Sequence, residues 1–259
     1  MPYANHQGIH IHYQIEGEGP PLVLQHGFTG NIKRWYLAGY VDALKPNYQL
    51  ILVDARGHGA SDKPHDPAAY TLPLHVGDVI AVLDALHLNK VNFWGYSMGG
   101  HIGFGMAKYA PKRVHALIIG GAQPYGRKLL PSSRLDGSDP DAFVAEFFRR
   151  LEVDSTAFPP AIREELYAND FRALAAALQD RPSLEDLLPT MTMPCLLYAS
   201  DADPVYPKTQ ACAQQIPNAT FFALQGLDHS AAFREAGLVL PSVIKFLRAV
   251  GEGVKTSAL

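Results

Sequence analysis

The stretch Gly95-Tyr96-Ser97-Met98-Gly99 decides the fold, because it joins a short apolar run at 91–94 to a helix-like segment at 100–110. A serine hydroxyl is a poor nucleophile unless it is held clear of its neighbours and close to a base. A tight strand-to-helix turn holds it clear, and the positions two residues before and after it must then be small. The five-residue pattern alone is common by chance, but its place between a strand and a helix predicts a catalytic nucleophile at Ser97.

Two polar residues further along the chain can complete a catalytic triad. Asp203 follows an apolar run at 194–199, and His229 follows another at 220–224. A histidine on a loop at a strand end can take the proton of a nearby serine and later return it. A carboxylate beside it can hold the imidazole tautomer. The sequence therefore predicts a triad in the chain order Ser97, Asp203, His229.

With these residues in place, the chain resembles the alpha/beta-hydrolase superfamily, and in particular serine carboxylesterase-like members with a helical cap. Four stretches carry the likeness over nearly the whole length: 25–30, 54–62, 95–100, and the loops that hold Asp203 and His229. The resemblance implies an α/β fold, with a mostly parallel, doubly wound sheet flanked by helices. It also implies a core domain at 1–122 and 194–259 and a helical cap at 123–193.

The same resemblance assigns the oxyanion hole and one carboxylate. In this family two backbone N–H groups bind the developing negative charge, and the matching residues here are Phe28 and Met98. Asp201 is a second carboxylate on the loop of Asp203, but Pro207, four residues after Asp203, matches the family pattern for the acid. Asp228 is adjacent to the histidine and cannot readily reach its Nδ1 hydrogen. We therefore favour Asp203 and keep Asp201 as the alternative.

Length and composition agree with one domain that carries an insertion. The chain has 259 residues, 47% of them apolar, and a net charge of −3 without long runs of one sign. This gives no indication of nucleic-acid or membrane binding, and the N-terminus has no signal-like pattern, so a cytoplasmic protein is expected.

Cys195 and Cys212 are expected to be buried thiols. His10 and His12 have no evident third ligand and are expected on a solvated strand, and we predict neither metal nor cofactor.

Periodicity divides the chain into strands and helices. Alternation at 9–15 predicts a half-exposed strand near a sheet edge, and short apolar runs at 22–25, 50–53, 91–94 and 117–119 predict strands covered on both faces. Helices are expected at 35–44, 74–86, 100–108 and 238–250. Between 123 and 193 the pattern is helical and rich in proline, as expected of a cap over the mouth of the site.

The predicted function is a serine hydrolase that cleaves carboxylic esters through an acyl-enzyme intermediate. The cap is rich in phenylalanine, so we expect neutral substrates with short to medium apolar acyl groups. The alternative functions are a carbon–carbon bond hydrolase or lactonase on the same triad, and a receptor of the same fold. The alternative for the substrate is an anion, which Arg127, Arg134 or Arg149 would favour if its side chain folded inward from the cap. The expected partner is a small-molecule ester, and the chain is expected to be a monomer or small homo-oligomer. The candidate substrate contacts are Trp35, Tyr96, Tyr125, Phe143 and Phe147.

Overall fold

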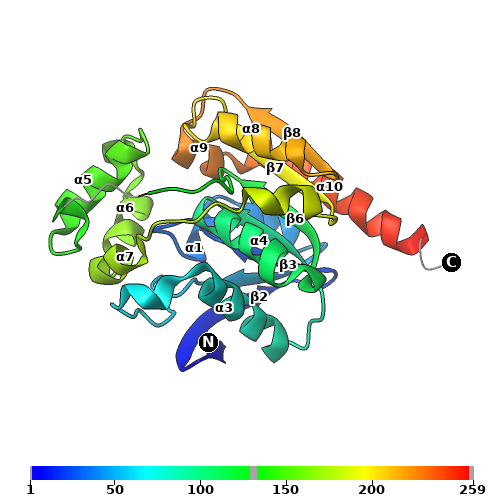
Figure 1. Ribbon diagram of the computed structural model, residues 1–259, viewed down its shortest axis with the longest axis horizontal. Helices are drawn as coiled ribbons and strands as arrows, with labels where there is room; N and C mark the ends of the chain where they lie inside the picture. The colour runs from blue at the N-terminus through cyan, green and yellow to red at the C-terminus, as the bar shows by residue number, and fades with distance from the viewer. Residues whose placement is uncertain (1, 129–132, 257–259) are drawn as a thin grey trace.

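A mostly parallel sheet forms the centre of the molecule (Figure 1). The computed structural model describes residues 2–128 and 133–256 of the chain. Within them the eight strands have the order β1-β2-β4-β3-β5-β6-β7-β8. The first two strands pair antiparallel and β2 is antiparallel to β4, whereas all pairs from β4 to β8 are parallel. The strands are β1 (Tyr3–His6), β2 (Ile9–Glu16), β3 (Pro21–Gln25), β4 (Gln49–Val53), β5 (Val91–Tyr96), β6 (Val114–Gly120), β7 (Cys195–Ser200) and β8 (Ala219–Leu224).

Helices cover both faces of the sheet, which explains the continuous apolar character of its central strands. Alternate residues of β3 point to opposite faces of the sheet and pack in different hydrophobic clusters. Val23 packs in one cluster, and Leu22 and Leu24 pack in the other. The helices are α1 (Lys33–Leu37), α2 (Tyr40–Leu44), α3 (Leu72–Ala85), α4 (Met98–Tyr109), α5 (Pro140–Arg150), α6 (Pro160–Tyr167), α7 (Phe171–Ala177), α8 (Tyr206–Gln215), α9 (His229–Arg234) and α10 (Ala236–Thr256).

Two features differ from the sequence prediction. The single helix expected at 35–44 is two short helices, because Gly39 adopts φ 84 and interrupts the hydrogen-bond ladder between them. The edge strand β1 was not predicted; it has four residues and is defined by its pairing with β2 rather than by a pattern of its own. The predicted strand at 9–15 corresponds to β2, beside that edge.

Helices α5, α6 and α7 lie together and apart from the sheet, on the left of the view in Figure 1. Their residues Phe143, Phe148, Leu166 and Phe171 are buried and belong to the same hydrophobic cluster as Val23 of the sheet. None of the helices in the described ranges is both long and apolar enough to cross a membrane. The thiols of Cys195 and Cys212 are free and buried.

Candidate active site

Ser97 occupies a strained turn between β5 and α4. Its backbone has φ 53 and ψ −110, a conformation that is rare for a residue with a side chain and costs about 1–3 kcal/mol. The turn is fixed by a hydrogen bond in which Ser97 N–H donates to the Gly120 carbonyl at 2.8 Å. A Cβ at Gly95 would collide with the Gly99 carbonyl, and one at Gly99 would collide with the Gln25 carbonyl. Both glycines are therefore required by the closeness of the backbone.

A continuous chain of hydrogen bonds joins three side chains from three strand ends. His229 Nε2 lies 2.9 Å from Ser97 Oγ, and His229 Nδ1 lies 2.6 Å from Asp203 Oδ2. Ser97 follows β5, Asp203 follows β7 and His229 opens α9 after β8. These strands are parallel, with β6 between β5 and β7, so their carboxyl ends bring the three residues to the same end of the sheet. Asp203 and His229 are 2% and 8% exposed, which strengthens the ion pair that forms when the imidazole is protonated.

The three nearby carboxylates have separate hydrogen-bond partners. Asp203 bonds to His229 through one oxygen and accepts from Val205 N–H at 3.0 Å through the other. Asp201 is exposed and accepts from Gly226 N–H at 2.6 Å. Asp228 caps α9 by accepting from the first two amides after His229. In this geometry Asp203 is the carboxylate that orients the histidine.

The loop at 27–30 lies directly against the serine turn. A Cβ built on Gly27 would stand 3.3 Å from Ser97 Cβ. The Phe28 ring packs against His58 and Phe147, with centroid separations of 5.4 and 5.0 Å. Met98 is the first residue of α4, so its N–H has no partner within the helix and lies at the positive end of the helix dipole.

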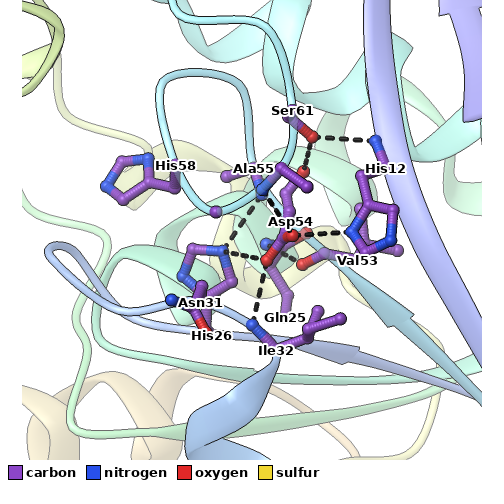
Figure 2. Close-up of polar contacts among 12 residues, drawn as sticks. His12, Gln25, His26, Asn31, Ile32, Val53, Asp54, Ala55, His58 and Ser61 are labelled. Carbon is purple, nitrogen blue, oxygen red and sulfur yellow. Dashed lines mark hydrogen bonds and ion pairs between the residues drawn. The ribbon is translucent and has the colours of Figure 1, made fainter. Parts of the chain in front are cut away.

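His26 supports this loop rather than the chemistry. Its Nδ1 donates to the Gly27 carbonyl at 2.8 Å, and its Nε2 accepts from Ala55 N–H at 3.0 Å, as Figure 2 shows for the second contact. Complete burial lowers the pKa of His26, which keeps the imidazole neutral and leaves Nε2 able to accept. Both nitrogens are engaged, in agreement with a bracing role.

Asp54 is a structural carboxylate at the end of β4 (Figure 2). It accepts from His12 Nδ1 at 2.7 Å and from the N–H groups of Ile32 and Ala60 at 2.9 Å. The expectation of a solvated strand at His12 was wrong: its side chain is 2% exposed and is held by Asp54, whereas His10 is exposed and bonds to Asp62. The periodicity could not distinguish these two histidines, because the partner of His12 lies 42 residues away.

Contacts from α6 and its C-terminal turn hold the loop beside the serine. Thr29, a β-branched residue, has φ 65, and its carbonyl accepts from Asn169 Nδ2 at 3.0 Å and Arg34 Nη2 at 3.3 Å. Glu165 accepts from Asn31 N–H at 3.1 Å and from Arg34 Nε at 3.0 Å. Such strain persists only where the surroundings fix it. The predicted cap region is thus bonded directly to the residues that follow Phe28.

A cavity of about 230 Å³ opens above Ser97 and His229. Its wall is mostly apolar and is built by the loop at 27–29, α1, α9 and the helices α5 and α6. The apolar side chains that line it include Phe147, Phe148, Leu151, Val153, Pro159, Ile162 and Phe233.

Two of the five predicted substrate contacts line this cavity, Tyr96 and Phe147. Burial raises the pKa of Tyr96 well above its usual value, and the protonated phenol donates to the His229 carbonyl at 2.6 Å. Trp35 packs among aromatic rings of the core, Phe143 is buried between helices α5 and α7, and the Tyr125 hydroxyl bonds to Gln215. These three therefore lie outside the cavity wall: the sequence identified aromatic residues but not the direction of their side chains.

The cavity wall also contains two arginines that the sequence analysis missed, Arg34 and Arg234. The three arginines of the predicted cap that could favour anions, Arg127, Arg134 and Arg149, are not part of the described wall. One signal was available: Arg234 lies four residues after Ser230, a spacing that places both side chains on one face of a helix that starts at His229.

Comparison with known proteins agrees with this architecture. The sequence profile of the family described as alpha/beta hydrolase fold matches residues 20–162. The chain is 31% identical over 272 residues to a pimeloyl-[acyl-carrier protein] methyl ester esterase of Xanthomonas campestris pv. campestris, covering 93% of this chain and 100% of that protein. It is 36% identical over 128 residues to a putative 2-succinyl-6-hydroxy-2,4-cyclohexadiene-1-carboxylate synthase of Bacillus subtilis, a match that spans only 45% of that protein.

Among solved structures, the enol-lactonase from Burkholderia xenovorans LB400 superposes with a TM-score of 0.80 at 25% identity, over 95% of this chain and 100% of that one. The chain belongs to the alpha/beta hydrolase fold family.

Proposed function

We propose that this protein is a serine hydrolase that cleaves carboxylic esters through an acyl-enzyme intermediate. The observation that carries the proposal is the unbroken hydrogen-bond chain from Asp203 through His229 to Ser97, at the floor of a mostly apolar cavity. Nucleophile, base and orienting group within hydrogen-bond reach are what this chemistry requires.

In the first step Ser97 Oγ attacks the ester carbonyl while His229 Nε2 takes its proton. The oxyanion is bound by the N–H groups of Phe28 and Met98, and the alcohol leaves with the proton from His229. Water then attacks the acyl-enzyme with His229 as base, and the acid is released. Asp203 holds Nδ1 protonated throughout and stabilises the imidazolium.

In this proposal the helices at 140–177 act as a cap over the site, within a cap domain at 123–193. Tyr96 and Phe147 contact the substrate. The apolar wall supports substrates whose acyl group next to the carbonyl is neutral and of short to medium length. A lactone is a cyclic ester and can follow the same steps, and the enol-lactonase neighbour supports it as a second candidate. Carbon–carbon hydrolysis on the same triad is a further alternative.

Initial rates on nitrophenyl esters of graded acyl length test the proposal. Each methylene that fits adds about 0.8 kcal/mol of apolar burial, so kcat/KM should rise with length and then fall when the cavity is full. A lactone and an anionic dienone-acid are measured alongside. Turnover of the dienone-acid with a higher kcat/KM than every ester would identify a carbon–carbon hydrolase instead, and a single turnover with all substrates would identify a receptor.

Glu165→Gln should lower kcat by about tenfold to a hundredfold, because small displacements of the groups that position the reaction carry costs of that size. The change removes the charge that holds Arg34, and with it part of the support for the loop that presents the Phe28 amide. KM for a short acetate ester should change much less than kcat, because the Phe28 amide binds the oxyanion that develops in the transition state rather than the ground-state ester.

The matched control is Glu164→Gln, the preceding residue on α6, whose side chain is exposed. It removes the same charge from the same helix without touching the loop and should behave like the wild type. If Glu165→Gln retains the wild-type kcat while remaining folded, α6 does not position the oxyanion hole.

A further inference from the structure

The charges on the cavity wall are not balanced. Arg34 and Arg234 both line it, and the described part of the wall has no acidic side chain. The charge of Arg34 is paired with that of Glu165, which is not part of the cavity wall. Arg34 Nε lies 3.0 Å from Glu165 Oε2, and both side chains are largely buried. Arg234 Nη1 donates to an uncharged partner, Ser230 Oγ, at 2.7 Å. One positive charge in this cavity therefore faces polar and aromatic groups rather than a carboxylate.

The Arg234 guanidinium is held in place before any ligand binds. It is the last residue of α9, the helix that begins at the catalytic histidine, and Ser230 lies one turn earlier on the same face. The Phe158 ring packs under the guanidinium, with its centroid 5.6 Å from Cζ. A guanidinium carries five N–H donors in a rigid fork, and one of them is used by Ser230. The others are available to a planar, bidentate acceptor.

We propose that Arg234 binds a carboxylate on the ester substrate, at the end remote from the scissile bond. The proposal rests on the proposed function and adds a substrate class to it: esters with an apolar segment next to the carbonyl and a carboxylate beyond it. The apolar side chains of Phe147, Leu151 and Ile162 accommodate the segment, and the fork of Arg234 binds the charge. The cost of burying a carboxylate is offset only by such a charge-assisted, bidentate contact.

The proposed class keeps a neutral apolar segment next to the carbonyl and differs from the predicted neutral esters by a charge at the remote end. The prediction of neutral esters depends on the lack of clustered basic residues in the cap. Arg234 lies outside the predicted cap, five residues after His229 in the chain. For a monoester of a dicarboxylic acid, Ser97 Oγ displaces the alcohol, which leaves with a proton, and water then releases the acyl group. The products are one alcohol, one dicarboxylate and one proton. Arg234 contacts only the remote carboxylate and takes no part in the bond changes.

Matched pairs of substrates test the proposal on the purified protein. The first series contains the monomethyl esters of succinate, glutarate and adipate, each compared with the same ester that carries a primary amide in place of the carboxylate. The second compares 4-acetoxybutanoate with its amide, which moves the carboxylate to the alcohol side. We expect kcat/KM to be at least about tenfold higher for the carboxylate in the first series, with a clear optimum of chain length. A preference confined to the 4-acetoxybutanoate pair would place the charge on the alcohol side and contradict the proposal.

Variants separate a direct contact from a general charge effect. Arg234→Gln should reduce the carboxylate-to-amide ratio of kcat/KM by about tenfold to a hundredfold, the range expected for hydrogen bonds to a charged group. Arg234→Lys, which keeps the charge but not the fork, should retain part of the ratio. Arg163→Gln is the control: it removes an equal charge from the exposed side of α6, outside the cavity, and should leave the ratio as in the wild type.

The outcomes distinguish this inference from the function on which it rests. Hydrolysis of both members of each pair at equal rates, with a ratio that Arg234→Gln does not alter, would refute the carboxylate site and leave the esterase intact. An equal loss of the ratio in Arg163→Gln would also refute it, by showing that long-range charge is sufficient. Absence of hydrolysis of carboxylates, amides and nitrophenyl esters alike would refute the proposed function, and the inference with it.

Discussion

Ser97→Ala is expected to reduce ester hydrolysis by roughly five to six orders of magnitude in kcat, while the protein folds normally. The hydroxyl is the group that attacks, and its removal leaves only the residual catalysis of the oxyanion hole and substrate binding. Alanine is smaller than serine and lacks only the Oγ that contacts His229 at 2.9 Å, so packing around the turn is kept. The measurement is kcat on the best nitrophenyl ester, with circular dichroism to check the fold.

Ser230 provides the matched control for that experiment. It also lines the cavity and directly follows His229 in the chain, but its Oγ bonds to Arg234 and not to His229. Ser230→Ala should therefore retain turnover of neutral esters within about one order of magnitude. A Ser97→Ala protein that hydrolyses esters at a rate near the wild type would remove Ser97 from the mechanism.

Asp203→Asn should lower kcat by about ten-thousandfold, the size of effect known for this change in triads. An amide cannot both accept from His229 Nδ1 and stabilise the imidazolium, and it favours the wrong tautomer. Asp203 Oδ2 lies 2.6 Å from Nδ1 in a buried site, so no solvent can replace the lost charge. The fall should appear in kcat rather than in KM.

Asp201→Asn is the control for Asp203, since it makes the same change two residues earlier. Asparagine can still accept from Gly226 N–H, and the site is exposed, so the effect should be about twofold or less. If Asp201→Asn caused the larger loss, the acid would have been assigned to the wrong carboxylate.

The sequence was sufficient for the parts of the fold that local chemistry determines. The serine turn could be read directly, because Gly95 and Gly99 are required wherever backbone approaches so closely. The central strands were equally clear, because burial on both faces produces continuous apolar runs. The chain order of Ser97, Asp203 and His229 then predicted the three side chains that the structure joins by hydrogen bonds.

What the sequence could not supply was side-chain direction and long-range pairing. Trp35 and Phe143 are aromatic in suitable segments, yet both are fully buried away from the cavity. The pairing of Glu165 with Arg34 spans 131 residues, and no periodicity indicates it. Arg234 was overlooked because its role depends on lying beside the cavity, not on a motif.

Covalent labelling tests most directly whether Ser97 is the nucleophile of a two-step hydrolase. The protein is treated with a serine-directed phosphonate, digested, and its peptides are analysed by mass spectrometry. The account predicts one label per chain, on the peptide that contains Ser97, with a parallel loss of ester hydrolysis and no label on Ser97→Ala. Labelling of another serine, or full esterase activity after Ser97 has been labelled, would contradict it.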